Sequence, residues 1–357
     1  MDWAELNPDI LCQIAKKVTD LSDFVRLRAV CKQWRSVVHP SHLPPQLPYL
    51  IQCSRNSSSS FGFHFCRLYS DKYHNLKVQI FSELEEWTSM FGSFTGFVLL
   101  LCEKPPISGL IINPLTGFQA PIPIQIEIES FLPLYIGPSC SHEPDLAENC
   151  IDLLGLVIES EPPNSTLVQK MILWRYTDNK WRKITEMRYS LDEHVMSYSS
   201  GRVFLTSHKT KYIKVVDVTN GNTVSFLPRL SDTFGSFVKA CGDLIGVRVR
   251  LPDMPNGQNL PVSDYQYELY QLKDSGTDPY WAGVNDIGDW MLFHNKGRNW
   301  LCLKASDFEG CKGNCIYSKS SLVSNSVNCY SVASETITQL HLLHNFDRCT
   351  WFLPSLC

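Results

Sequence analysis

The sequence predicts two parts: a small all-α unit over residues 1–43 and a mainly-β domain over residues 44–357, expected to be a degenerate β-propeller. Three observations support this division. Helix start signals and apolar residues at helical spacing gather near the beginning of the chain. A proline-rich segment, HPSHLPPQLPYL, follows them. Beyond it, short runs rich in β-branched and aromatic residues alternate with turn signals.

The composition is that of a globular protein. The chain has 357 residues, of which 44% are hydrophobic and 19% charged, so it can bury a sizeable core. Its net charge of −4 divides into +1 over residues 1–50 and −5 over the remainder. Neither part has the excess of positive charge that polyanion binding needs, so we expect no nucleic acid partner.

Targeting signals are not apparent. Asp2 and Glu5 interrupt the first residues, and the most apolar stretch, FTGFVLLLC, is far too short to cross a bilayer. We therefore expect no membrane partner and a location in the nucleus or the cytoplasm. The 14 cysteines are then expected to be reduced thiols rather than a disulfide framework.

The first helix is expected to begin at Asn7-Pro8-Asp9. Asparagine suits the N-cap, proline suits the first helical position, and an acidic residue is stabilised near the positive end of the helix dipole. A single apolar face follows at helical spacing. Its residues are Ile10, Leu11, Ile14, Ala15 and Val18.

Two further helices are predicted before residue 40. The second is expected to start at Ser22, with Phe24, Val25 and Leu27 as its apolar residues. The third has an apolar face of Val30, Cys31, Trp34, Val37 and Val38. It should end at His39-Pro40, because the residue before a proline disfavours the helical conformation.

This helical unit has few large side chains for its length. Burying a leucine, isoleucine or valine stabilises by about 1.5–3 kcal/mol, whereas ordering one residue of backbone costs about 1–2 kcal/mol. A unit of this size is therefore marginal by itself, and a partner that covers its remaining apolar side chains would stabilise it.

The same residues resemble the F-box motif, through Leu6, Pro8, Ile10-Leu11, Ile14, Leu27, Val30-Cys31-Lys32 and Trp34-Arg35. In that family the motif docks onto the Skp adaptor of a cullin–RING ubiquitin ligase. The resemblance implies adaptor-facing or motif-core roles for Leu6, Pro8, Ile10, Leu11, Ile14, Val30, Cys31 and Trp34. The alternative of a DNA-binding helix-turn-helix, reading bases through Lys32, Gln33 and Arg35, is disfavoured because the unit is nearly neutral.

In the second part, turn signals separate strand-like runs at five places: 114–117, 177–180, 219–222, 273–276 and 333–335. The units INPLTGFQAPIP and VDVTNGNTVSFLP can be laid over each other. Such units recur at loose spacings of about 40–60 residues, which suits degenerate propeller blades of undetermined number. A sandwich or two packed sheets is the alternative.

Several stretches of this part resemble the KIB-type β-propeller region of plant F-box proteins. They are GSFTGFVLLL, IINPLTG, DIGDWMLFHNKG, LKASDFEGCKGNCIYS and WFLPSL. The resemblance covers most of residues 44–357 and is clearest from Ser306 to Tyr317. It implies an interaction domain and supplies no ligand, so the substrate-binding residues stay unknown.

Motifs for bond chemistry are lacking. Cys311 and Cys315 come closest to a metal signature. Zinc needs four ligands in compatible pairs, and no matching second pair flanks these two cysteines. The nearest other candidates are His294 and Cys302. We therefore expect two reduced thiols, no metal and no cofactor. Scattered aspartates are expected in hairpin turns. These are Asp286, Asp289 and Asp307. No phosphate loop or nucleophile motif is present, so we expect no catalytic residues.

Together these features favour a non-catalytic substrate-receptor subunit of an Skp–cullin–F-box ubiquitin ligase. Its expected partners are an Skp-family adaptor, a cullin reached through that adaptor, and a protein substrate of unknown identity. Two alternatives stay open. One is a propeller enzyme or small-molecule receptor with its pocket at the channel mouth, and the other is an F-box protein that acts outside a ligase.

Overall fold

The structure is a computed structural model of the chain. It describes residues 6–18, 20–57, 60–69, 73–79, 87–102, 108–122, 130–138, 151–161, 166–188, 193–199, 201–207, 211–230, 235–240, 242–250, 266–274, 278–295, 299–319, 325–342 and 349–355. No helix among these residues is long and apolar enough to cross a membrane.

Three short helices form the first unit: α1 (Pro8–Ala15), α2 (Leu21–Ala29) and α3 (Lys32–Val37), followed by a 3₁₀ turn, η2 (Pro40–His42). Asn7 caps α1 as predicted, since its Oδ1 accepts a hydrogen bond from the backbone N–H of Asp9. The predicted start of α2 at Ser22 is wrong: Asp20 is the cap, because its carboxylate reaches the N–H groups of Ser22 and Asp23.

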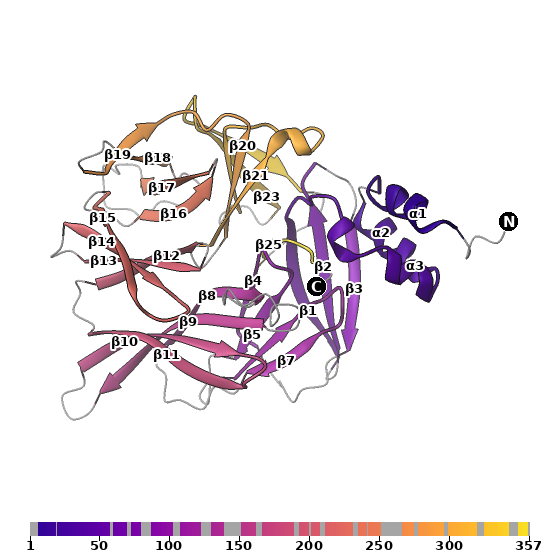
Figure 1. Ribbon diagram of the computed structural model, residues 1–357, viewed down its shortest axis with the longest axis horizontal. Coiled ribbons are helices and arrows are strands. Elements are labelled where there is room, and N and C mark those ends of the chain that lie inside the picture. The colour runs from indigo at the N-terminus through magenta and orange to yellow at the C-terminus, as the bar shows by residue number, and fades with distance from the viewer. Residues whose placement is uncertain are drawn as a thin grey trace.

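Six sheets surround a central axis, and each is one blade of a β-propeller (Figure 1). The predicted propeller is therefore confirmed, and the sandwich alternative is wrong. From the inside outward, blade 1 contains β25 (Thr350–Phe352), β1 (Tyr49–Ser57), β2 (Ser60–Arg67) and β3 (Tyr73–Gln79). Blade 2 contains β4 (Ser89–Gly92), β5 (Val98–Cys102), β6 (Ser108–Ile112) and β7 (Gln119–Ile122), and blade 3 contains β8 (Ser130–Pro138), β9 (Ile151–Glu161), β10 (Thr166–Arg175) and β11 (Lys180–Arg188).

The remaining blades follow in chain order. Blade 4 contains β12 (Glu193–Ser199), β13 (Arg202–Ser207), β14 (Tyr212–Asp217) and β15 (Thr223–Pro228), and blade 5 contains β16 (Gly235–Ala240), β17 (Asp243–Arg250), β18 (Gln266–Lys273) and β19 (Tyr280–Val284). Blade 6 has five strands, β21 (Asn299–Lys304), β20 (Trp290–Asn295), β22 (Cys315–Lys319), β23 (Ser326–Ser331) and β24 (Thr336–His341).

Blade 6 departs from the antiparallel pattern, since β20 and β22 run parallel. The segment that links β21 to β22 crosses the blade and includes η5 (Ala305–Asp307). Gly313 lies so close to blade 6 backbone that a Cβ there would be 2.6 Å from the carbonyl oxygen of Gly288. Asn314, in the left-handed region, accepts the N–H of Ile287 on its side chain. This crossover contains the stretch that carries the clearest family resemblance.

The predicted turns occupy equivalent places in the ring. The turns at 114–117, 177–180 and 219–222 join the third strand to the fourth in blades 2, 3 and 4, and the turn at 333–335 joins the last two strands of blade 6. In blade 5, residues 275–276 of the predicted turn lie outside the described residues. In three of the turns the backbone N–H of a left-handed residue, Gly117, Asn179 or Gly221, donates to the carbonyl four residues earlier. The two units that could be overlaid in sequence are thus the same hairpin in blades 2 and 4.

In blades 2 to 5, successive strands run in opposite directions, so the turn from the first strand to the second and the turn from the third to the fourth lie on the same side of the propeller. We call this side the hairpin rim; its turns include residues 93–97, 113–118, 176–179 and 218–222.

The core consists of apolar layers between neighbouring blades. Among the described residues, the layer between blades 1 and 6 contains 14 buried apolar residues and that between blades 2 and 3 contains 13. The layer between blades 4 and 5 contains only four, Phe204, Ile213, Val215 and Phe237. Blades 4 and 5 are therefore the least tightly joined neighbours in the described part of the ring.

Candidate functional site

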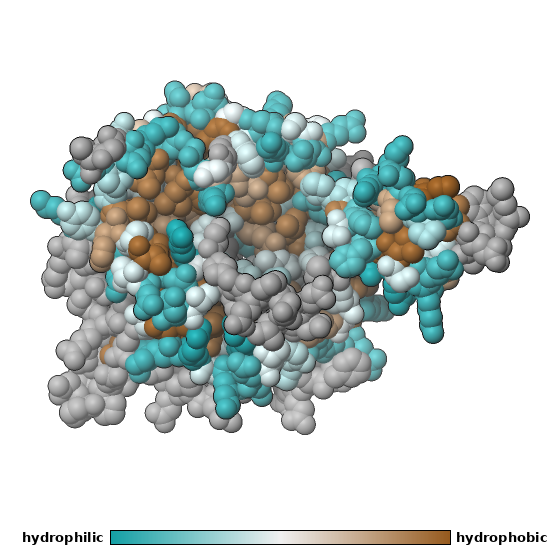
Figure 2. Space-filling model, in the orientation of Figure 1, coloured by the Kyte–Doolittle hydropathy of each residue, from teal (hydrophilic) through white to brown (hydrophobic). Residues whose placement is uncertain are grey.

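The helical unit seals a small core and leaves aliphatic side chains outside it. Leu11, Ala15, Phe24, Trp34 and Val38 are buried together. Figure 2 shows hydrophobic residues on the outer surface of this unit. The exposed fractions of Ile10, Ile14 and Val30 are 52%, 39% and 57%.

The eight residues implied by the F-box resemblance divide accordingly. Leu11 and Trp34 lie in the core, and Leu6 and Cys31 pack against it in half-buried positions. Pro8, Ile10, Ile14 and Val30 are exposed. We call Ile10, Ile14 and Val30 the exposed aliphatic set.

Cys31 has a local role of its own. It is the N-cap of α3, and its Sγ accepts a hydrogen bond from the backbone N–H of Trp34 at 3.4 Å. The cap orients α3 so that Trp34 enters the core. Cys31 therefore serves the geometry of the unit.

The helical unit meets the propeller through α2, and α1 lies farther from the propeller (Figure 1). A mostly apolar cavity of about 310 Å³ lies at this junction, and its lining includes Leu21 and Val25 of α2 and Tyr49, Leu76 and Pro354 of the propeller side. Burial raises the pKa of the Tyr49 phenol above its ordinary value. Since α2 faces the propeller, α1 keeps Ile10 and Ile14 available to another protein.

The junction lies at the hairpin rim. Tyr49 opens β1, the second strand of blade 1, and Pro354 follows β25, the first. Leu115 also lines the junction and belongs to the third-to-fourth strand turn of blade 2. The helical unit is therefore attached beside one particular face of the ring.

The propeller has a second cavity, of about 400 Å³, at the mouth of its channel on the hairpin rim. Its aromatic lining includes Tyr135 and Tyr198, whose ring centroids are 4.6 Å apart, and Trp300. Ser199 and Lys239 add polar groups from the inner strands of blades 4 and 5. The sequence signalled none of these residues, because they come together only when the ring closes.

The candidate metal ligands do not assemble into a site. Among the described residues, no group of three or more His, Cys, Asp or Glu side chains is placed to hold a metal ion. The ring of His294 stacks on Trp300 with centroids 4.3 Å apart, and burial lowers its pKa to about 4. Cys302, Cys311 and Cys315 are free thiols.

The aspartates of this region support turns. Asp286 accepts a hydrogen bond from the backbone N–H of Gly288, and Asp289 accepts hydrogen bonds from the N–H and hydroxyl of Ser306. Such contacts are what short acidic side chains ordinarily provide in loops.

Two family models match the chain. The F-box domain matches residues 3–46, and the KIB1-4 β-propeller matches residues 65–335, which is more than half of the chain. The chain belongs to the KIB1-4 β-propeller family. Both resemblances that the motifs carried are thereby confirmed.

No curated protein matches the chain. Among solved structures, TolB from Acinetobacter baumannii is 11% identical with a TM-score of 0.43, over 85% of this chain and 65% of that chain. An acylaminoacyl peptidase in complex with Z-Gly-Gly-Phe-chloromethyl ketone is 10% identical with a TM-score of 0.39, over 84% and 52%. Acylaminoacyl peptidase from Pyrococcus horikoshii is 10% identical with a TM-score of 0.37, over 82% and 52%. The chain thus spans between half and two thirds of these structures.

Proposed function

We propose that this member of the KIB1-4 β-propeller family is the substrate-receptor subunit of an Skp–cullin–F-box ubiquitin ligase. The observation that carries the proposal is the exposed aliphatic set on a helical unit whose core is otherwise sealed. Ile10 and Ile14 are one helical turn apart on α1 and present a continuous apolar surface. A partner helix is the natural cover for such a surface.

The mechanism is positional. The F-box fixes the protein on the Skp adaptor, and through it on the cullin, while the propeller holds a protein substrate. Holding the substrate near the conjugating enzyme replaces a bimolecular encounter with a local one. The chain itself then supplies no catalytic group and no cofactor, and we place this work in the nucleus or the cytoplasm.

The energy expected from the proposed docking can be estimated from side-chain exposure. The three side chains of the exposed aliphatic set are about half exposed, so covering them should contribute about 1 kcal/mol each. A carboxylate placed in the covered interface would cost several kcal/mol more, because it would lose its water. Docking is therefore expected to depend strongly on Ile10 and Ile14.

The test is capture of the full-length chain by purified Skp adaptor. The double variant Ile10→Asp, Ile14→Asp is expected to bind at least about a hundredfold more weakly. Leu11 is unsuitable for this test, since it is only 1% exposed and a charge there would unfold the helices. Val224→Asp, Phe226→Asp is the matched control, because it places two charges on exposed apolar positions of the propeller.

Unchanged capture of the double variant would show that docking uses another face. Failure of the wild-type chain to bind any adaptor would favour a propeller enzyme or small-molecule receptor. If the adaptor binds but the substrate's half-life does not change when cullin activity is blocked, the protein acts outside a ligase.

A further inference from the structure

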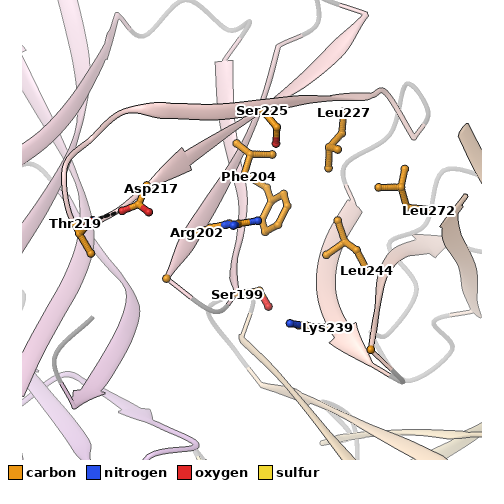
Figure 3. A pocket seen from close by; sticks show the side chains of 13 residues that line it. Ser199, Arg202, Phe204, Asp217, Thr219, Ser225, Leu227, Lys239, Leu244 and Leu272 are labelled. Carbon is orange, nitrogen blue, oxygen red and sulfur yellow. Dashed lines mark hydrogen bonds between the residues drawn. The ribbon is translucent and has the colours of Figure 1, made fainter. Parts of the chain in front are cut away.

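The weak contact between blades 4 and 5 opens into a groove at the hairpin rim (Figure 3). The groove has a volume of about 380 Å³, within the range of ordinary ligand sites. Only four buried apolar residues join blades 4 and 5 in the described part of the chain. We call this space the blade 4–5 groove.

Part of its wall is apolar. Phe204 and Leu227 come from blade 4, and Leu244 and Leu272 come from blade 5, so that side chains from both blades line one space (Figure 3). Leu227, Leu244 and Leu272 are each only partly buried. A ligand with apolar side chains would therefore remove exposed hydrophobic surface from water.

The mouth of the groove carries cationic groups. Arg202 and Lys239 are exposed, and no described residue pairs with either of them. The acidic member of the lining, Asp217, is already engaged, because its Oδ1 accepts from both the N–H and the hydroxyl of Thr219 (Figure 3). Arg202 and Lys239 outnumber the single carboxylate of the lining, so the groove has a net charge of +1, which favours an anionic group in the ligand.

The groove is continuous with the channel mouth. Ser199 and Lys239 line both cavities, so Lys239 lies where the two meet. Two adjacent cavities that share lining residues suit an extended chain, which can occupy both, better than a compact molecule. Two cations are too few for a nucleic acid backbone, which needs many phosphate contacts.

We propose that the blade 4–5 groove binds an extended peptide segment of the protein substrate, in which an acidic side chain lies next to apolar side chains. The carboxylate contacts Arg202 and Lys239, and the apolar neighbours enter between Leu227 and Leu272. This inference rests on the proposed function, since it supplies the substrate site that a receptor needs. It also places substrate and helical unit on the same rim of the ring.

The experiment selects ligands from a phage-displayed library of random dodecapeptides on the immobilised full-length protein. Enriched peptides are expected to carry Asp or Glu beside Leu, Ile, Val or Phe. The variant Arg202→Glu, Lys239→Glu should bind them at least about tenfold more weakly, since each lost charge-assisted contact is worth about that factor. Leu272→Ser should keep the acidic preference and weaken binding of the apolar neighbour.

Lys214→Glu is the matched control. Lys214 lies on β14 between Ile213 and Val215, and its side chain therefore projects from the face of blade 4 opposite to the groove. This variant should bind the selected peptides as the wild type does. Circular dichroism and the melting temperature confirm that all variants are folded.

Three outcomes overturn the proposal: no enrichment over the empty support, enriched peptides without acidic residues, or equal binding by the charge-reversed variant. The ligase proposal is tested separately with Ile10→Asp, Ile14→Asp, which should still bind the selected peptides. If this variant loses adaptor capture but still binds the peptides, both proposals are supported. If the wild-type chain binds the peptides but captures no adaptor, only the ligase proposal is refuted.

Discussion

Asn295 closes the ring, and its replacement by alanine tests how much closure contributes to stability. The side chain is 2% exposed and lies where blades 1, 2 and 6 meet. Its Nδ2 donates to the carbonyl oxygens of Gly92 and Trp351, both at 3.0 Å. Its Oδ1 accepts from the hydroxyl of Thr350 at 2.6 Å and the N–H of Trp351 at 3.2 Å.

The expected loss follows from these four hydrogen bonds. Each contributes about 1 kcal/mol net, and removing one partner of a buried pair costs more when the other is left behind. We expect Asn295→Ala to lower the free energy of unfolding by about 3–6 kcal/mol, which is a large part of the about 5–15 kcal/mol typical of a domain. Thr350→Val removes one of the four contacts and also the hydrogen bond that the Gly92 N–H donates to Thr350 Oγ1, so it should cost about 1–3 kcal/mol.

The assay is urea unfolding of the full chain followed by tryptophan fluorescence, since the chain has nine tryptophans. Because Asn295 and Thr350 share a contact, the double variant should be more stable than the sum of the single losses predicts. Asn222→Ala, at an exposed turn position, is the control and should change stability little. A loss below about 1 kcal/mol for Asn295→Ala would refute this account of closure, as it would equal a single hydrogen bond.

Three further predictions concern stability. Burial lowers the pKa of His294 from 6.5 to about 4, so the unfolded state binds more protons than the folded state between these pH values. The free energy of unfolding should therefore fall by at most about 3 kcal/mol as the pH drops through that window. His294→Phe should remove this part of the pH dependence in urea titrations. Arg175→Met should cost about 3–5 kcal/mol in urea unfolding, because it removes the guanidinium from the fully buried carboxylate of Asp152, 3.0 Å away. Gly92→Ala should lower the melting temperature through a loss of at least about 2 kcal/mol, because its Cβ would lie 2.2 Å from the carbonyl oxygen of Trp351.

Each of these has a control within the chain. Phenylalanine keeps a ring stacked on Trp300, so a changed pH dependence reports the proton and not the stacking. Adding Asp152→Asn to Arg175→Met should recover much of the lost stability, and no recovery would mean that packing dominates there. Gly117→Ala has open space around it, so it tests backbone strain without a steric clash.

The turn chemistry explains why most of the propeller was predictable. Asn113 to Gly117 and Asp217 to Gly221 place a left-handed glycine at the same point of the hairpin, and glycine is visible in sequence. In blade 6 the left-handed residue is Glu335, which carries no such signal by itself. Blade 1 escaped prediction because its inner strand, β25, is separated from β1 by the whole ring.

The helical unit shows where periodicity stops being informative. Ile10 and Leu11 are adjacent and both belong to the predicted apolar face, yet Leu11 is 1% exposed and Ile10 is 52% exposed. An apolar face wide enough to include both residues does not predict which of its edges packs against the core. That choice is made by the packing of Phe24 and Trp34 against Leu11, which depends on the second and third helices.

The blade 4–5 groove was beyond sequence analysis altogether. Arg202 and Lys239 are charged residues in strands of alternating polar and apolar pattern. They border the same groove only because blades 4 and 5 are loosely packed against each other. A pattern of period two predicts that such residues point outward from a strand. It does not predict that they border a common space.

During synthesis, the helical unit is completed before the propeller can close. α1 to α3 leave the ribosome before any blade exists, whereas β25, the inner strand of blade 1, is synthesised after every other strand. A message truncated before Trp351 would encode intact docking helices on an open ring. Under the proposed function, such a fragment would occupy the adaptor while presenting no substrate, and it would act as a dominant inhibitor of the full-length protein.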